Sequence, residues 1–320
     1  MFTINKYSSK DINSWKTTNV ICLHIKISNN KLSYTKINNG YEDRAESIIQ
    51  MINDTLHKYK INDLEIYINL MDKPLNNLYF LHFSRTTVCP INTIPNFSFY
   101  EWKEVKLKNF FSIKDDILNN QYKWEDKVNK ILWSGTDSCN IRIKFNMLKT
   151  HEMYEYNLIN YGIPHKYYEL KDNTKYKYLL DLEGVGYSGR FPYLALTGSC
   201  VILLENSDQN RDYKLYYDKH FIEDLHYIKI RYNENDEISC INDKIIDKIN
   251  NTNCKQIGEA CQQVAINLFT KDNILLYMSE LLNYYASYYQ NKDEILNPNI
   301  IYSFSYITDK LKKIFFNKYK

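Results

Sequence analysis

The sequence has few cysteines and none in a recognisable pattern. Seven are scattered through 320 residues, and no two are spaced as Cys-x-x-Cys. A disulfide framework needs paired cysteines, and a structural zinc site needs closely spaced ligands. We therefore expect neither, and we assign no metal ligands in the chain.

Long apolar runs are also missing. No stretch reaches the roughly 18 apolar residues of a membrane-spanning helix. The first residues, Met1 to Lys6, begin no apolar run of signal-peptide length. We therefore expect a cytoplasmic protein without a transmembrane segment.

The chain also lacks a large excess of positive or of negative charge. The 41 Lys and Arg side chains nearly balance 38 Asp and Glu, which leaves a net charge of +3. This is too small for a general nucleic-acid field, although it leaves room for a local anion site. We expect no nucleic-acid partner.

The apolar content is sufficient for two globular domains. Hydrophobic residues make up 44% and charged residues 25% of the chain, close to globular averages. A single core usually stops growing beyond roughly 250 residues, so 320 residues predict two domains. The 30 tyrosines mostly keep helix or strand periodicity and do not indicate disorder.

The first third alternates between strand and helix patterns. Residues 19–27 and 64–71 are apolar enough for strands, and residues 42–57 between them have one apolar helical face. This order predicts a βαβ unit. A loop-rich stretch at residues 73–123 follows and contains the expected inter-domain connection, so we predict an N-terminal Rossmann-like domain over residues 1–125.

The same alternation returns in the second domain, residues 126–320. Apolar strands are predicted near residues 130–133, 178–182 and 200–205, with helices at 140–150 and from about 188 to 196. Such spacing is typical of a parallel sheet with right-handed crossovers. The remainder is a helical tail, and we expect its basic last helix, residues 304–320, to pack on the protein, with peripheral membrane contact as the alternative.

Glycine is scarce, with 8 in the chain, yet three lie close together after the predicted strand 178–182. They are Gly184, Gly186 and Gly189. A glycine-rich turn between a strand and a helix is a common phosphate-binding site, because backbone N–H groups and the helix N-terminus face the ligand. Without a ligand, the same glycines would form only a tight turn.

Arg190 gives this turn a specific interpretation. Pro192 belongs in the first turn of a helix, so the helix is predicted to begin near Ser188, its N-cap. A cation in that turn is unfavourable unless an anion binds there. The alternative is an ion pair between Arg190 and a carboxylate such as Glu183.

Two other strand ends carry polar residues. Thr136 follows one predicted strand, and Arg142 lies about one turn into the next helix. Together with the turn at Arg190, this strand end can clamp a diphosphate between two arginines. Asp72 follows the strand at 64–71, at the sheet edge where open α/β folds place active sites, although alone it would be a solvated turn aspartate.

In this order, these segments resemble glycosyltransferase family 90, which includes the protein O-glucosyltransferases and fungal capsule xylosyltransferases. The best-matching stretch is residues 177–201, with Gly184, Ser188 and Arg190. Residues 135–142 resemble the family's glycine turn and following arginine, and residues 68–74 resemble the strand that carries its catalytic aspartate. Ser134 stands where the family usually has arginine.

The resemblance implies a GT-B fold of α/β type, with two Rossmann-like domains facing across a cleft. It also implies an inverting, metal-independent enzyme without a cofactor that moves glucose or xylose from a UDP-sugar to a hydroxyl of a glycan or protein. Asp72 would then be the general base. The donor site would contain Thr136, Arg142, Glu183, Gly184, Gly186, Ser188 and Arg190.

Two other classes of function stay open. A GT-A glycosyltransferase would hold a divalent cation with an Asp-x-Asp motif, to which residues 181–183 and 63–65 come nearest. A tyrosine-rich protein that binds sugars or single-stranded nucleic acid by stacking would be no enzyme. A GT-A enzyme would need a metal ion for turnover. A non-enzymatic binding protein would not hydrolyse a UDP-sugar.

Overall fold

The computed structural model describes residues 19–75, 80–89, 92–158 and 169–290. The chain divides into two compact units, of which the first runs to Phe110 and resumes at Thr270, and the second is Phe111–Phe269. The predicted boundary near residue 125 and the C-terminal domain running to residue 320 both differ from this division. The reason is helix α8 (Lys271–Gln290), which packs on the sheet and helix of the first unit.

The first unit contains a mixed sheet. Its strands, in the order β2-β1-β3-β4, are β1 (Cys22–Ser28), β2 (Lys31–Ile37), β3 (Leu64–Asn69) and β4 (Phe80–Leu81). β1 is antiparallel to both β2 and β3, and β3 is parallel to β4. The predicted Rossmann-like βαβ unit from residues 19–27 to 64–71 is therefore wrong.

A hairpin causes this difference. Asn29 and Asn30 join β1 to β2 with φ angles of 50° and 58°, as a type I′ turn requires. Helix α2 (Glu42–Lys58) then leads from β2 to β3, and these two strands run the same way on either side of β1. A β-α-β crossover is therefore present, but it connects β2 to β3, which lie on either side of β1.

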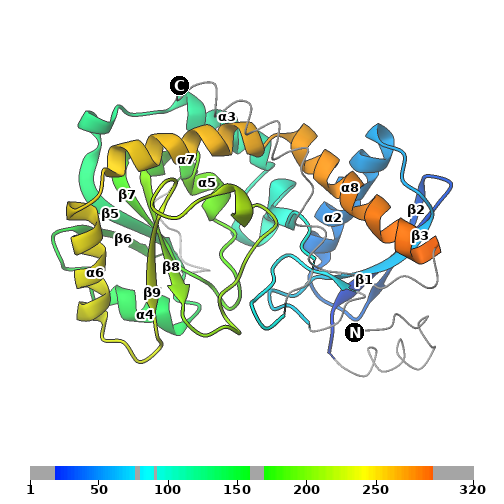
Figure 1. The fold of residues 1–320 in the computed structure, drawn as a ribbon, viewed down its shortest axis with the longest axis horizontal. Helices are drawn as coiled ribbons and strands as arrows, with labels where there is room; N and C mark the ends of the chain where they lie inside the picture. Colours follow the sequence, from blue (N-terminus) through cyan, green and yellow to red (C-terminus); the bar gives the residue numbers. More distant parts are fainter. Residues whose placement is uncertain (1–18, 76–79, 90–91, 159–168, 291–320) are drawn as a thin grey trace. The chain divides into compact units, whose positions relative to one another are not determined.

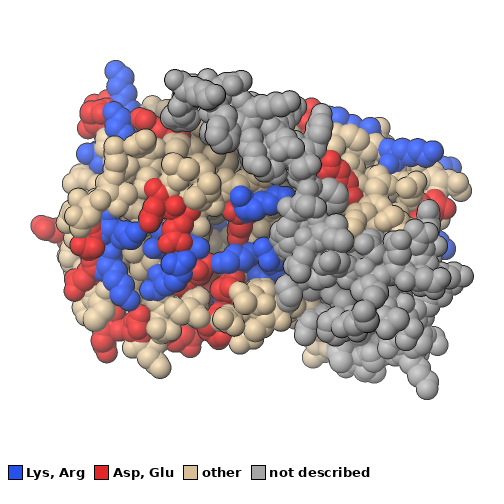
Figure 2. All heavy atoms as spheres, viewed as in Figure 1, with Lys and Arg blue, Asp and Glu red and all other residues tan. Residues whose placement is uncertain are grey.

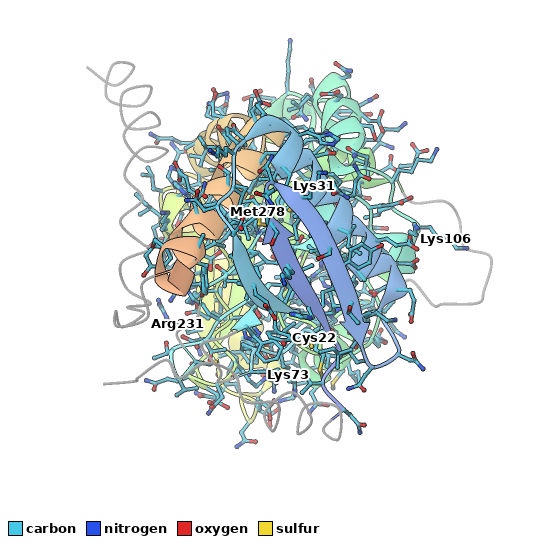
Figure 3. The ribbon with its side chains drawn as sticks, turned by 90° about the vertical axis from the view of Figure 1, so that its right-hand side faces the viewer. Cys22, Lys31, Lys73, Lys106, Arg231 and Met278 are labelled. Atoms are coloured by element: carbon cyan, nitrogen blue, oxygen red, sulfur yellow. The ribbon has the colours of Figure 1, made fainter. Side chains whose placement is uncertain are left out.

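The carboxyl end of β3 lies beside the start of β1, since Asn69 pairs with Cys22. Figure 3 shows Cys22 and Lys73 at one end of this sheet and Lys31, at the hairpin turn, at the other. Asp72 therefore follows β3 at the end away from the hairpin. α2 and α8 bury apolar side chains against one another and against the sheet.

The second unit contains the predicted parallel sheet, with five strands in the order β6-β5-β7-β8-β9 (Figure 1). The strands are β5 (Val128–Gly135), β6 (Tyr154–Leu158), β7 (Tyr176–Asp181), β8 (Cys200–Asn206) and β9 (Ile228–Tyr232). All neighbours are parallel. The α/β class is confirmed, and the apolar patterns of the sequence predicted β5, β7 and β8 of these five strands.

The other described α-helices are α3 (Phe110–Asn119), α4 (Asn140–Asn146), α5 (Phe191–Leu194), α6 (Ile238–Asn250) and α7 (Cys254–Leu268). α7 packs on β8, and α6 packs on β9. A Cβ atom at Gly258 of α7 would lie 2.7 Å from the carbonyl oxygen of Gly198. Glycine at this position therefore permits the close approach of α7 to the sheet.

Two predicted helices are shorter than expected. α4 ends at Asn146 rather than near residue 150, and α5 is one turn of four residues that begins at Phe191. Gly198 has φ +67°, a backbone conformation that favours glycine, and ends the segment after α5. The last predicted helix, residues 304–320, lies outside the described residues.

Charges of both signs are interspersed over the described surface in Figure 2, without a broad region of one sign on that face. This distribution agrees with the small net charge of +3. Within the described ranges, no helix is both long and apolar enough to cross a membrane.

Candidate functional site

The candidate site lies where the connections of the second sheet change direction. From β5 the chain goes to β6 on one side, and from β7 it continues to β8 and β9 on the other. Open parallel sheets bind ligands at this switch point, beyond the carboxyl ends of the strands. Ser134 and Asp181 each lie two residues past the paired Leu132 and Leu179, so the two strand ends meet there.

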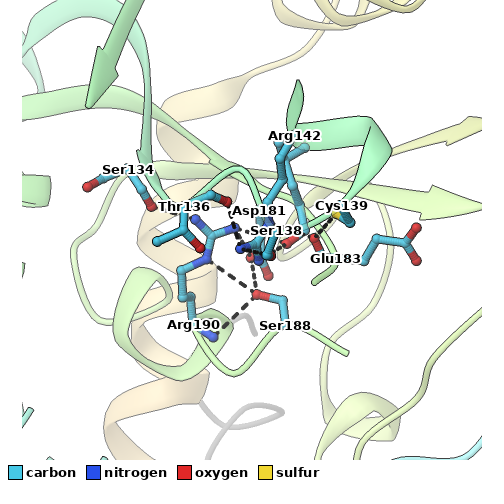
Figure 4. A network of polar contacts seen from close by, with 10 residues as sticks. Ser134, Thr136, Ser138, Cys139, Arg142, Asp181, Glu183, Ser188 and Arg190 are labelled. Atoms are coloured by element: carbon cyan, nitrogen blue, oxygen red, sulfur yellow. Dashed lines mark hydrogen bonds and ion pairs between the residues drawn. The ribbon is translucent and has the colours of Figure 1, made fainter. Parts of the chain in front are cut away.

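Arg190 extends across these strand ends (Figure 4). Its Nη1 donates to the carbonyl oxygen of Ser134 at 2.7 Å, and its Nη2 donates to the carbonyl oxygen of Leu182 at 3.0 Å. Nη2 also donates to Oδ1 of Asp181 at 3.2 Å, and Nε donates to Oγ of Ser188 at 3.4 Å. The side chain is 16% exposed and is thus held on both strands.

Arg142 reaches the same strand ends from α4. Its Nε donates to the carbonyl oxygen of Glu183 at 2.8 Å, and its Nη2 donates to that of Leu182 at 3.2 Å. Nη1 donates to the carbonyl oxygen of Thr136 at 3.3 Å and to Oγ of Ser138 at 3.1 Å. The structure therefore brings together the two arginines that the sequence predicted for a diphosphate site.

This pair carries more positive charge than its neighbours neutralise. Asp181, 1% exposed, pairs with Arg190, whereas no carboxylate in the described ranges forms an ion pair with Arg142. Burial, and then the nearby Arg142 cation, lower the pKa of Arg190 to about 10. An anion bound here would relieve that cost.

The two guanidinium groups also have unused donors. Each has five N–H groups, and each uses four of them in the contacts above. One hydrogen on Nη1 of Arg190 and one on Nη2 of Arg142 have no acceptor among the described residues. The pair is therefore suited to a polyvalent anion such as a diphosphate.

Trp133 fixes the position of both cations. Its buried ring lies 5.8 Å from Cζ of Arg142 and 5.5 Å from Cζ of Arg190, within the range of cation–π attraction. The ring stacks on Tyr156 at 4.7 Å. A Cβ at Gly135 would lie 2.8 Å from this ring and 3.3 Å from Nη1 of Arg190, so a glycine is needed there.

The predicted glycines have a smaller role in the local backbone geometry. The positive-φ glycines of the described chain are Gly40 and Gly198, which excludes Gly184, Gly186 and Gly189. Gly184 donates its N–H to the carbonyl oxygen of Gly186 at 3.1 Å, which makes a tight turn. A Cβ at Gly184 would lie 3.5 Å from Nη2 of Arg142, an ordinary contact.

Ser188 is not the helix N-cap that the sequence predicted. The N-cap of α5 is Arg190, without a side-chain capping bond, and the Ser188 hydroxyl donates to Oδ1 of Asp181 at 2.5 Å. Because α5 is a single turn, positive charge comes from the arginines and not from a helix terminus. Asp181 and Trp133 were not predicted as donor-site residues, because a buried aspartate at a strand end resembles any edge polar group. Gly135 was noted only as part of the turn that resembles the family's.

Asp72 lies in the first unit, in the turn that follows β3. Its carboxylate is 31% exposed and accepts a hydrogen bond from Nη1 of Arg44 at 2.7 Å. The rest of its backbone turn is also fixed, because its carbonyl oxygen accepts from Ser84 Oγ at 3.3 Å. It is therefore an ordered carboxylate at the end of β3 and not a solvated turn residue.

Both candidate Asp-x-Asp motifs of the GT-A alternative are committed to local contacts. Asp63 accepts from the backbone N–H of Asn29, and Glu65 pairs with His24. The Asp181 carboxylate pairs with Arg190, and the Glu183 carboxylate pairs with Arg211. In the described residues, no three His, Cys, Asp or Glu side chains form a group that could hold a metal ion.

Comparison with known proteins identifies the family. The model of glycosyl transferase family 90 matches residues 8–299. The chain belongs to this family.

Relatives of this family 90 chain include the protein O-glucosyltransferase 2 of Danio rerio, 26% identical over 85% of the chain and 57% of the relative. The human protein O-glucosyltransferase 3 is 24% identical over 85% of the chain and 56% of the relative. The chain thus spans little more than half the length of these relatives. A glycosyltransferase structure from Rickettsia africae is similar at a TM-score of 0.33, with 8% identity over 65% of the chain and 57% of that protein.

One predicted donor residue of this family 90 chain has its side chain elsewhere. The Glu183 carboxylate accepts from Nη2 of Arg211 at 2.5 Å and from the Tyr232 hydroxyl at 2.7 Å. Burial raises its pKa, although both partners act in the opposite direction. Glu183 contacts the arginine pair through its carbonyl oxygen, which holds Arg142.

Proposed function

We propose that this chain is an inverting, metal-independent glycosyltransferase that moves glucose or xylose from a UDP-sugar to a hydroxyl of a glycan or protein. The observation that carries the proposal is the pair Arg142 and Arg190, which faces the strand ends with uncompensated charge and two unused N–H donors. Family 90 membership supports sugar transfer as the chemistry. It also supports a GT-B type of fold, with the correction that the first sheet is mixed.

In the proposed reaction, the UDP diphosphate binds the two guanidinium groups. Charge grows on the β-phosphate as the bond to the sugar breaks, and fixed cations stabilise that charge more in the transition state than in the ground state. A divalent cation does the same in GT-A enzymes. Here the arginines supply the positive charge, so we propose that no metal is needed.

Asp72 is the proposed general base. A single displacement requires a carboxylate to remove the acceptor hydroxyl proton while the oxygen attacks the anomeric carbon. Its Oδ1 is held by Arg44, whereas Oδ2 has no partner among the described residues. Oδ2 is therefore the atom that we assign to the proton transfer.

The test is turnover of UDP-glucose and UDP-xylose in excess EDTA, measured as UDP release with glycosides and Ser-containing peptides as acceptors. We expect release from at least one donor, and a β-linked product from the α-linked donor in its NMR coupling constants. A requirement for manganese or a retained anomer would contradict the mechanism. Absence of any release, hydrolysis included, would favour a non-catalytic binding protein.

A further inference from the structure

Arg44, on the first turn of α2, is more completely fixed than an ordinary surface arginine. Its side chain is 7% exposed. Nη1 donates to the carbonyl oxygen of Leu70 at 2.9 Å and to Oδ1 of Asp72 at 2.7 Å. Nε and Nη2 donate to the two carboxylate oxygens of Glu104 at 2.6 and 3.0 Å. The planar fork therefore joins the end of β3 to Glu104.

Aromatic rings restrain the same guanidinium group. Its Cζ lies 4.1 Å from the ring centroid of Tyr41 and 4.6 Å from that of Phe97. Tyr41 has a left-handed backbone conformation, with φ 54° and ψ 38°. This conformation is unfavourable for a bulky residue, and such strain is concentrated at functional sites. Here it coincides with a ring placed against Arg44.

The Asn69 side chain also holds the backbone on both sides of Asp72. The Asn69 side chain accepts from the N–H of Met71 at 3.0 Å and donates to the carbonyl oxygen of Lys73 at 2.8 Å. Arg44 adds control of the carboxylate itself. With Oδ1 bound, the side chain presents Oδ2 in one direction.

A guanidinium beside a carboxylate weakens the carboxylate as a base, so the positive charge of Arg44 has to be balanced. Glu104 takes two of the hydrogen bonds of Arg44 and neutralises its charge. The group of Arg44, Asp72 and Glu104 thus has one cation and two carboxylates, an excess of one negative charge. Asp72 therefore gains a fixed orientation beside a cation whose charge is already paired with Glu104.

We propose that Arg44 is a positioning residue for Asp72 and that Glu104 sets the charge that Arg44 presents to it. This inference rests on the proposed role of Asp72 as the base. The relevant variants are Arg44→Lys, which keeps the charge but loses the planar fork, and Glu104→Gln, which keeps hydrogen-bonding capacity but loses the compensating charge. Glu46→Gln on α2 is a matched control, because Glu46 pairs with Lys103 at the surface.

The experiment measures kcat and KM for UDP-glucose, from the release of UDP, in wild type and in the Asp72→Asn background. We expect kcat to fall by roughly 10- to 100-fold in Arg44→Lys, since small misplacements of a catalytic group cost about this much. Glu104→Gln should lower kcat about 10-fold, with KM within about twofold of wild type. In the Asp72→Asn background, both variants should have almost no further effect, because their target is already removed.

Three results would overturn the inference. They are unchanged kcat in both variants, an equal loss in the two backgrounds, and a similar loss in Glu46→Gln. If Arg44→Lys fails to fold in thermal unfolding, the two-background comparison with Glu104→Gln decides alone. Failure of the proposed function is distinguishable, because wild type would then release no UDP, or Asp72→Asn would keep the activity of wild type, whatever the Arg44 and Glu104 variants show.

Discussion

Arg142 and Arg190 donate hydrogen bonds to the same atom, the carbonyl oxygen of Leu182, at 3.2 and 3.0 Å. Two cations are thus held side by side directly after β7. Like charges at this separation repel, and the ion pair with Asp181 offsets one of them. The arrangement is costly without a ligand and favourable with a polyvalent anion, which is the basis of the proposed donor site.

Removing Arg190 should destabilise the protein. Arg190→Ala leaves Asp181, 1% exposed, as a buried carboxylate without its cation, and breaking such a pair costs roughly 3–5 kcal/mol. Adding Asp181→Asn should restore much of the loss in urea unfolding. The sequence predicted Arg190 as a cation at a helix N-terminus, and removing such a cation should cost no stability. A fully stable Arg190→Ala would therefore contradict the role of Asp181.

Gly135 should matter more than Gly184 for binding of UDP. A Cβ at Gly135 would meet the Trp133 ring at 2.8 Å and Nη1 of Arg190 at 3.3 Å, whereas one at Gly184 finds its nearest neighbour at 3.5 Å. We expect Gly135→Ala to weaken UDP binding by about 10-fold or more, as loss of one charge-assisted hydrogen bond would. Gly184→Ala serves as the matched control in calorimetry. Equal effects of the two substitutions would show that Trp133 does not position Arg190.

Sequence patterns predicted β5, β7 and β8 of the second sheet because these strands contain continuous apolar runs followed by turns. The meeting of Arg142 and Arg190 followed from this, since the carboxyl ends of neighbouring parallel strands share an edge. Asp181 was missed because its partner, Arg190, follows it by nine residues, a spacing that matches no local pattern.

The first sheet was predicted wrongly for a different reason. β2 is mostly exposed and polar, so it has no apolar pattern, and its hairpin turn contains Asn-Asn without glycine. Arg44 has no sequence signal at all. Its partners Asp72 and Glu104 lie 28 and 60 residues away, and only the tertiary fold brings them together.

Stability should fall in mild acid because of His226. Its Nδ1 accepts the backbone N–H of Ile222 at 2.9 Å, which requires the unprotonated ring nitrogen. Burial lowers its pKa from 6.5 to about 4. Below pH 6.5 the unfolded state takes up a proton that the folded state does not, so stability present above that pH is lost as the pH falls towards 4.

Between pH 6.5 and about pH 4, His226 should lower the free energy of unfolding by about 3 kcal/mol. Urea unfolding at several pH values measures it, and His226→Asn, which retains an acceptor oxygen but does not titrate, should flatten the slope. An unchanged slope in this variant would assign the acid sensitivity to other groups.

Asp72→Asn tests the proposed base. Asparagine keeps the size of the side chain and can still accept from Arg44, but it cannot take a proton. Turnover should fall by roughly 10²- to 10⁴-fold, while the Kd for UDP stays within about twofold, since the arginine pair belongs to the other unit. Near-normal turnover would remove Asp72 from the mechanism and leave the donor site untouched.

The most direct test of the central claim is calorimetric titration of the wild-type protein with UDP in excess EDTA, with uridine as the control that lacks phosphates. If Arg142 and Arg190 hold the diphosphate, UDP should bind with a micromolar Kd, about −8 kcal/mol, and uridine at least 100-fold more weakly. Arg142→Ala, which leaves no buried carboxylate unpaired, should lose about 10-fold or more of the UDP affinity. Binding of UDP only after manganese is added, or equal affinity for UDP and uridine, would contradict the account.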